Sequence, residues 1–163
     1  MSKADGAAQS RRAEPADGRG SALRGQARNR PVLVALRVLI AAGLIVSAVI
    51  HFQLAPGFQQ AYPAGIGGGT LFRIQAVVAV LAALYVLVRG SRAAYAAAAV
   101  VALSALAAVV LYRYIQIPAI GPIPSMYEPV WYASKTLTAA AEATAGILAA
   151  IGYTRLSRRQ ERI

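Results

Sequence analysis

The stretch PVLVALRVLIAAGLIVSAVIHFQL, residues 31–54, decides the fold, because Arg37 is the only Lys, Arg, Asp or Glu that it contains. About 20 apolar residues, each rising about 1.5 Å along a helix, are enough to cross the roughly 30 Å hydrocarbon core of a bilayer. Arg37 lies near the start of the run, where a long side chain can extend to the headgroups. The stretch therefore predicts a membrane-spanning helix.

Three more apolar stretches, residues 70–88, 93–112 and 130–153, are long enough for the same interpretation. Residues 55–69 contain two prolines and five glycines, and residues 113–129 contain four prolines, so we expect both segments to be loops rather than helix. The short segment of residues 89–92 allows only a tight reversal between antiparallel neighbours. We therefore expect an all-α fold, an antiparallel bundle of four transmembrane helices within residues 31–154.

The composition also favours a membrane protein. The chain has 163 residues, of which 58% are hydrophobic, and this is more apolar than an ordinary soluble domain. Its formal net charge of +11 would suit a nucleic-acid-binding protein, but the charges lie at the ends of the apolar stretches, so we expect no nucleic-acid partner. The chain has no cysteine, which excludes disulfides, thiolate metal sites and iron–sulfur clusters.

Both ends of the chain are polar and basic. Residues 1–30 are rich in Ala, Gly, Ser, Arg and Gln without apolar periodicity, so we expect a disordered tail. Residues 155–163 form a shorter basic tail. Both tails are expected to contact anionic lipid, which attracts each nearby cation by about 1 kcal/mol. Because the first apolar stretch is long and follows a polar segment, we interpret it as an uncleaved anchor and not as a signal peptide.

The distribution of cations predicts the orientation. Thirteen of the 17 Lys and Arg residues lie within residues 1–30, 89–92 and 155–163. Cationic segments next to membrane helices are retained on the cytoplasmic side. We therefore expect a multi-pass plasma-membrane protein with both termini in the cytoplasm and with residues 55–69 and 113–129 on the outer side.

Three ionisable residues, Glu128, Lys135 and Glu142, recur at seven-residue intervals around the fourth stretch. Seven residues turn a helix by about 700°, so these side chains fall on nearly one face at steps of roughly 10 Å. A charge at the centre of a membrane helix costs about 2.5–3.5 kcal/mol, so Glu142 has to be neutral, paired or hydrated. Its role stays open between a proton relay or ligand-binding group and a purely structural group in the bundle.

Other polar and aromatic residues gather at the expected outer ends of the helices. The single histidine, His51, is expected to form a hydrogen bond with a loop carbonyl or with Glu128. Arg73 is expected either to pair with Glu128 or to anchor at the lipid headgroups. One histidine supports neither haem nor copper ligation, so no cofactor, metal or catalytic residue is assigned. The candidate polar and ligand cluster is His51, Arg73, Gln75, Tyr112, Arg113, Tyr127, Glu128, Trp131, Lys135 and Glu142.

Two segments carry a resemblance to known proteins. The sequence LFRIQ, residues 71–75, opens the second stretch, and MYEPVWY, residues 126–132, leads to Lys135 and Glu142. With the four spans, these segments resemble small four-helix integral membrane proteins of actinobacteria, over about residues 32–153. DoxX-like proteins share only the general layout. The resemblance implies a plasma-membrane location and no particular reaction.

The sequence favours a non-enzymatic accessory or scaffold subunit that binds a protein or lipid partner, or a further copy of the chain, through the outer cluster. Small residues in the third and fourth stretches would suit such lateral association. The alternative is a small carrier or proton-linked conduit that uses Lys135 and Glu142. A third possibility is an enzyme that acts on a lipid or quinone at the outer leaflet.

Overall fold

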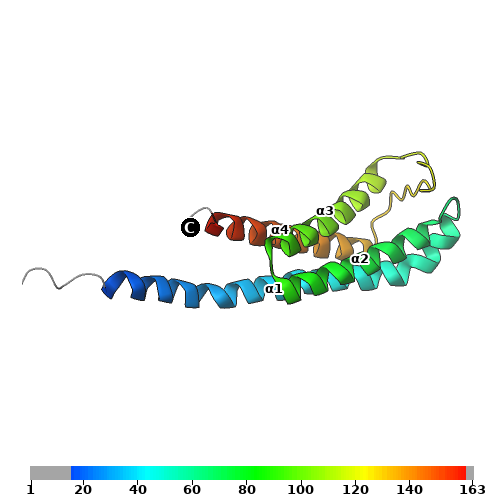
Figure 1. The fold of residues 1–163 in the computed structure, drawn as a ribbon. Coiled ribbons are helices and arrows are strands. Elements are labelled where there is room, and N and C mark those ends of the chain that lie inside the picture. The colour runs from blue at the N-terminus through cyan, green and yellow to red at the C-terminus, as the bar shows by residue number, and fades with distance from the viewer. Residues whose placement is uncertain (1–15, 161–163) are drawn as a thin grey trace, which may run out of the picture. The chain divides into compact units, whose positions relative to one another are not determined.

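A computed structural model describes the backbone of residues 16–160 and the side chains of residues 31–158. Within this part of the chain, four helices follow one another: α1 (Ala16–Ala61), α2 (Gly68–Arg89), α3 (Arg92–Tyr114) and α4 (Ala133–Gln160) (Figure 1). The described residues contain no strand, so the predicted all-α fold is confirmed. Residues 31–61 of α1, all of α2 and all of α3 are long and apolar enough to cross a membrane.

Helix α1 begins earlier than the sequence predicted. Residues 16–30 were expected to be disordered, but their backbone is helical; the rest of the predicted tail, residues 1–15, lies outside the described residues. The segment contains three Ala and four Arg, which are strong helix formers, beside three Gly, which are not. Lengthening an existing helix also avoids the unfavourable nucleation step. Residues 16–34 and residues 35–160 belong to two separate compact units, and the packing described below lies within the second.

Helix α1 also ends later than predicted. Residues 55–69 were expected to be a loop, but α1 continues through Pro56 and Gly57 to Ala61. Contacts with α2 stabilise the additional turns, because the ring of Phe58 stacks on that of Phe72 with centroids 4.0 Å apart. The side chain of Gln59 also accepts a hydrogen bond of 3.1 Å from the backbone N–H at position 70, in the first turn of α2. These contacts offset the one backbone hydrogen bond that a proline removes.

The α1–α2 and α3–α4 connections lie at the same end of the molecule. The N–H of Ile66 donates to the carbonyl of Pro122 at 2.9 Å, and the hydroxyl of Tyr62 donates to the carbonyl of Tyr127 at 3.0 Å. Burial and then the negative charge of Glu128 raise the pKa of Tyr62 above its ordinary value of 10.0. The two loops therefore form one joined structure, which we call the loop end of the molecule.

The opposite end carries the tight reversal between α2 and α3. Gly90 has a φ of 51°, in the left-handed region that favours glycine. The hydroxyl of Ser91 accepts a hydrogen bond of 3.2 Å from the N–H of Ala94 and so caps α3. The guanidinium of Arg92 lies 5.2 Å from the ring centroid of Tyr153 on α4. The predicted tight turn is thus present, and it lies beside the C-terminal half of α4.

Small residues form most of the buried core. Ala79, Ala98 and Ala102 are fully buried, and large aliphatic side chains such as Val88 and Val100 are exposed. Glycine allows a close approach between α1 and α4, because a Cβ added at Gly43 would lie only 3.0 Å from a backbone oxygen of α4. Small buried residues with a large apolar exterior are typical of helices that associate within lipid, where burying apolar surface gives little driving force.

Candidate functional site

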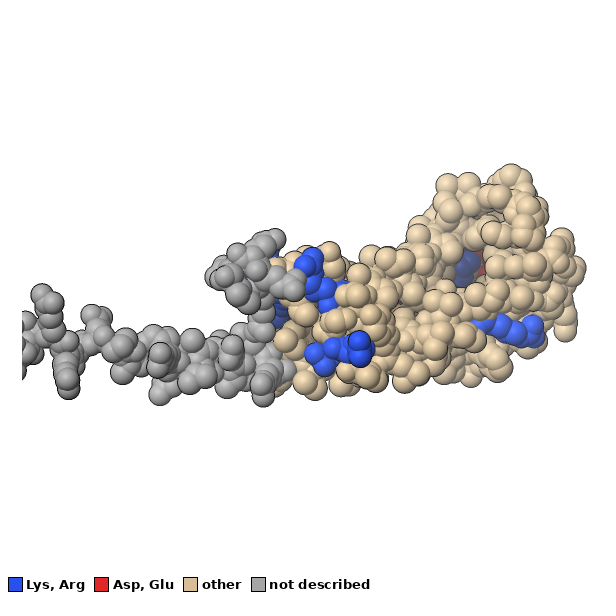
Figure 2. Space-filling model, in the orientation of Figure 1, with Lys and Arg blue, Asp and Glu red and all other residues tan. Residues whose placement is uncertain are grey.

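A cavity of about 350 Å³ lies at the loop end. The last turns of α1 and α3, the first turns of α2 and α4, and the α3–α4 loop all contribute to its lining. Most of the lining is apolar and includes Leu54, Phe58, Phe72, Val109 and Met126. In Figure 2, blue and red surface meet inside a hollow near this end, and most of the face around it is uncharged.

An ion pair contributes the charged part of the lining. The Nζ atom of Lys135 donates a hydrogen bond of 2.6 Å to the carbonyl of Glu128 and lies 3.6 Å from its Oε2. The hydroxyl of Tyr132 donates to the same Oε2 at 3.2 Å, and Lys135 is only 6% exposed. This buried cation therefore has its counter-charge beside it, as buried charges generally require.

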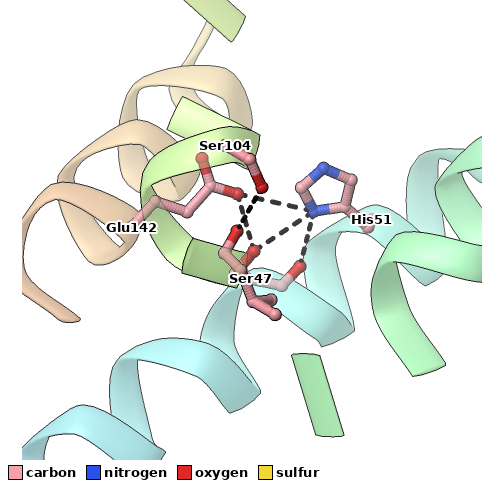
Figure 3. A network of polar contacts seen from close by, with 5 residues as sticks. Ser47, His51, Ser104 and Glu142 are labelled. Carbon is pink, nitrogen blue, oxygen red and sulfur yellow. Dashed lines mark hydrogen bonds and ion pairs between the residues drawn. The ribbon is translucent and has the colours of Figure 1, made fainter. Parts of the chain in front are cut away.

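A second polar network lies next to the cavity and joins α1 to α4 (Figure 3). The hydroxyl of Ser47 donates a hydrogen bond of 2.7 Å to Oε1 of Glu142. Nδ1 of His51 lies 3.9 Å from the same oxygen. Glu142 is fully buried, Ser47 is 1% exposed and His51 is 7% exposed. Of the three, only His51 lines the cavity.

The hydrogen bonds of His51 identify which ring nitrogen carries the proton. Nδ1 lies 2.9 Å from the carbonyl oxygen of Ser47, and because a carbonyl only accepts, Nδ1 must be the donor. Nδ1 is also 3.3 Å from the Ser47 hydroxyl, whose own proton is directed to Glu142. The neutral ring therefore keeps Nε2 as a hydrogen-bond acceptor. Figure 3 shows the second ring nitrogen turned away from Ser47 and Glu142.

Four buried polar atoms in this region have no hydrogen-bond partner among the described residues: Thr138 Oγ1, Gln75 Nε2, Glu142 Oε2 and Arg113 Nε. Thr138 and Gln75 line the cavity, and Thr138 is only 3% exposed. Leaving a buried donor or acceptor unsatisfied costs about 1–3 kcal/mol, so each such group in a folded protein requires an explanation. For Thr138 and Gln75 the explanation is the cavity, because a molecule bound there would supply the missing hydrogen-bond partners.

The cavity brings together half of the candidate cluster. His51, Gln75, Tyr112, Glu128 and Lys135 line it, and Glu142 joins it through the network with His51.

The other four candidates are not part of the lining. Arg73 is exposed, and the side chain of Trp131 is 40% exposed with Lys135 Nζ 5.7 Å from its ring. Arg113 lies over the ring of Tyr114, 4.9 Å from its centroid, and Tyr127 contributes its carbonyl to the loop contact with Tyr62.

The structure shows different interaction partners for Glu128 and His51 from those that the sequence predicted. Glu128 pairs with Lys135 and not with Arg73, because α4 begins only at Ala133 and the preceding segment folds back toward the lysine. His51 bonds the carbonyl of Ser47, one helical turn away, and neither a loop carbonyl nor Glu128.

Sequence reasoning missed Ser47, although a signal was present. Ser47 lies four residues before His51, which places both side chains on one face of a helix.

Comparisons with protein-family models, with curated proteins and with solved structures found no match. The resemblance to small four-helix membrane proteins therefore stays a prediction. The fold alone therefore defines the class of the protein: its described residues are all-helical and include three helices long and apolar enough to cross a membrane.

Proposed function

We propose that this chain is a plasma-membrane protein of four spans that binds a lipid-class molecule in the cavity at the loop end, as a non-enzymatic accessory protein. The single observation that carries this proposal is the cavity itself, with apolar walls and an ion pair between the buried Lys135 and the half-buried Glu128. Ligand sites generally combine a mostly apolar lining with a few placed polar groups, in volumes of about 300–1,000 Å³.

The position of the cavity mouth supports a ligand that arrives from the bilayer. Ile74 on α2 and Ser104 and Ala108 on α3 line the cavity and are exposed, so the opening runs between these two helices. Figure 1 shows the ribbons of α2 and α3 diverging from their turn toward the loop end. Both helices are apolar enough to lie in the membrane. An opening between two such helices faces lipid and not water.

The fourth span is part of the proposal, and the burial pattern of α4 supports it. The polar residues that lower its hydropathy, Lys135, Thr138 and Glu142, are buried in the bundle, and the outward side chains include Leu137 and Ile147. Ionisable residues in membrane helices generally face the protein interior in this way. Helix α4 has 28 residues, more than the roughly 20 that a span requires.

The orientation is supported by the two ends of the bundle. The basic α2–α3 turn lies at one end, beside the C-terminal half of α4, and the two loops, which are poor in Lys and Arg, join at the other. Cationic segments favour the cytoplasm. We therefore place both termini in the cytoplasm and the loop end on the outer side.

The test is to identify what co-purifies with the full chain in mild detergent, by mass spectrometry of the extracted lipids and small molecules. Ala108→Phe fills the cavity mouth, whereas Ala107→Phe adds the same ring at a neighbouring exposed position on α3 that does not line the cavity. We expect a lipid-class molecule to be retained by wild type and by Ala107→Phe and to be lost from Ala108→Phe. Equal retention by all three proteins would contradict the proposal.

A second candidate function is a proton-linked conduit, because Glu142, Ser47 and His51 form a connected polar chain between α4 and the cavity lining. Buried ionisable chains of this kind occur in proton pathways. Lys135, however, is engaged by Glu128. The conduit therefore depends mainly on Glu142, and proton flux through the Glu142→Gln variant tests it.

A further inference from the structure

The polar residues that line the cavity indicate which kind of head group its lipid ligand carries. The two charges of the cavity, on Lys135 and Glu128, are paired with each other at 3.6 Å. Neither charge of the lining is therefore left free to pair with a charged ligand, and burying an ion without a partner is unfavourable. The cavity is therefore suited to a neutral head group.

The remaining polar atoms of the lining define its hydrogen bonds. Gln75 Nε2 is a donor without a partner among the described residues, and the hydroxyl of Thr138 is likewise unpartnered. His51 lines the same cavity, and its neutral ring keeps Nε2 as an acceptor because Nδ1 donates to the carbonyl of Ser47. The site thus offers both donors and an acceptor to one small head group.

We propose that the ligand, on the basis of the lipid-binding function above, is an apolar chain with a neutral hydroxyl head group, such as a long-chain alcohol or a diacylglycerol. A hydroxyl donates one hydrogen bond and accepts others, so its chemistry matches both the acceptor His51 Nε2 and the unpartnered atoms of Gln75 and Thr138 in the lining. A methyl ether is unable to donate, and a carboxylate adds a charge. The apolar tail would leave through the opening beside Ile74 into the bilayer.

The experiment uses two photoreactive probes with the full-length protein in phosphatidylcholine nanodiscs: hexadecanol and hexadecanoate, each with a mid-chain diazirine. Crosslinked residues are mapped by mass spectrometry. Unlabelled hexadecanol, its methyl ether, hexadecanoate and dioctanoylglycerol then compete. We expect the alcohol probe to label the lining, and hexadecanol or dioctanoylglycerol to compete at least about tenfold better than the ether or the acid. Stronger competition by hexadecanol would indicate a ligand with one chain, and stronger competition by dioctanoylglycerol a ligand with two chains.

A pair of threonine variants tests the hydrogen bond. Thr138→Val removes a hydroxyl that has no partner among the described side chains and backbone, so the described fold loses no hydrogen bond. Thr144→Val is the matched control, because its hydroxyl is exposed and bonds the carbonyl of Ala140 on the same helix. We expect Thr138→Val to weaken competition by hexadecanol about fivefold, from the loss of one neutral hydrogen bond, and Thr144→Val to leave it unchanged.

The possible results separate the two proposals. If neither probe labels the lining, the cavity is not a ligand site and both proposals are wrong. If the lining is labelled but the acid or the ether competes as well as the alcohol, the hydroxyl head group is wrong, and lipid binding in the cavity remains. Unchanged competition in Thr138→Val would also overturn the proposed role of its hydroxyl.

Discussion

Replacing Glu142 by glutamine is expected to leave the free energy of unfolding within about 1 kcal/mol of wild type, whereas alanine should lower it by about 2–4 kcal/mol. The carboxyl group is fully buried, and its hydrogen bond of 2.7 Å from Ser47 is the only one among the described residues. Glutamine keeps the carbonyl oxygen that accepts this bond and nearly the same shape. It also removes the possibility of an uncompensated buried charge.

The alanine variant loses two contributions. The hydrogen bond from Ser47 is worth about 1 kcal/mol. Removing the rest of a fully buried side chain leaves a void, for which comparable truncations cost at least about 2 kcal/mol. The loss of about 2–4 kcal/mol corresponds to a decrease in Tm of roughly 5–15 °C for a chain of this size.

The assay is thermal unfolding of purified full-length protein in detergent, for wild type, Glu142→Gln, Glu142→Ala and the exposed control Thr144→Ala. Proton flux is measured on the same proteins in liposomes. If Glu142→Gln lowers Tm as much as Glu142→Ala, the carboxyl is a paired structural charge and the reasoning is refuted. A stable glutamine variant with proton flux equal to wild type would remove the conduit, because glutamine does not titrate.

Three further predictions follow from the fold. A reporter fused after Arg92 should report the cytoplasm and one fused near Pro122 the outer side; a cytoplasmic signal at Pro122 would rule out four spans. Gly43→Val should lower stability by about 1–3 kcal/mol, measured as Tm, because an added Cβ would lie only 3.1 Å from the Cβ of Ala145; an unchanged Tm would show that α1 and α4 do not approach so closely. The raised pKa of Tyr62 means that the folded state favours its neutral phenol, so this stabilisation is complete below about pH 10 and is lost as the pH rises through the raised value. Tm should therefore fall more steeply above pH 10 in wild type than in Tyr62→Phe, and parallel profiles would contradict this.

The sequence by itself determined the helical class and the positions of the apolar helices. The capacity to span a membrane depends on the summed hydropathy of about 20 consecutive residues, which is a local property. The reversal at Gly90 and the break before α4 were also readable, because proline and glycine act through the local backbone. The helical face shared by Lys135 and Glu142 followed from helix periodicity alone, and both side chains are buried.

Only the tertiary structure decided where α1 ends and which groups meet. Pro56 and Gly57 predicted a loop, but contacts with α2, including the stacking of Phe58 on Phe72, stabilise the additional turns. The hydrogen bond between Ser47 and Glu142 joins residues 95 positions apart. Periodicity assigns a side chain to one face of its own helix, but the neighbour which that face meets depends on the rotation and close approach of packed helices. In this protein small residues such as Gly43 allow that approach, and the buried network between Ser47 and Glu142 depends on it.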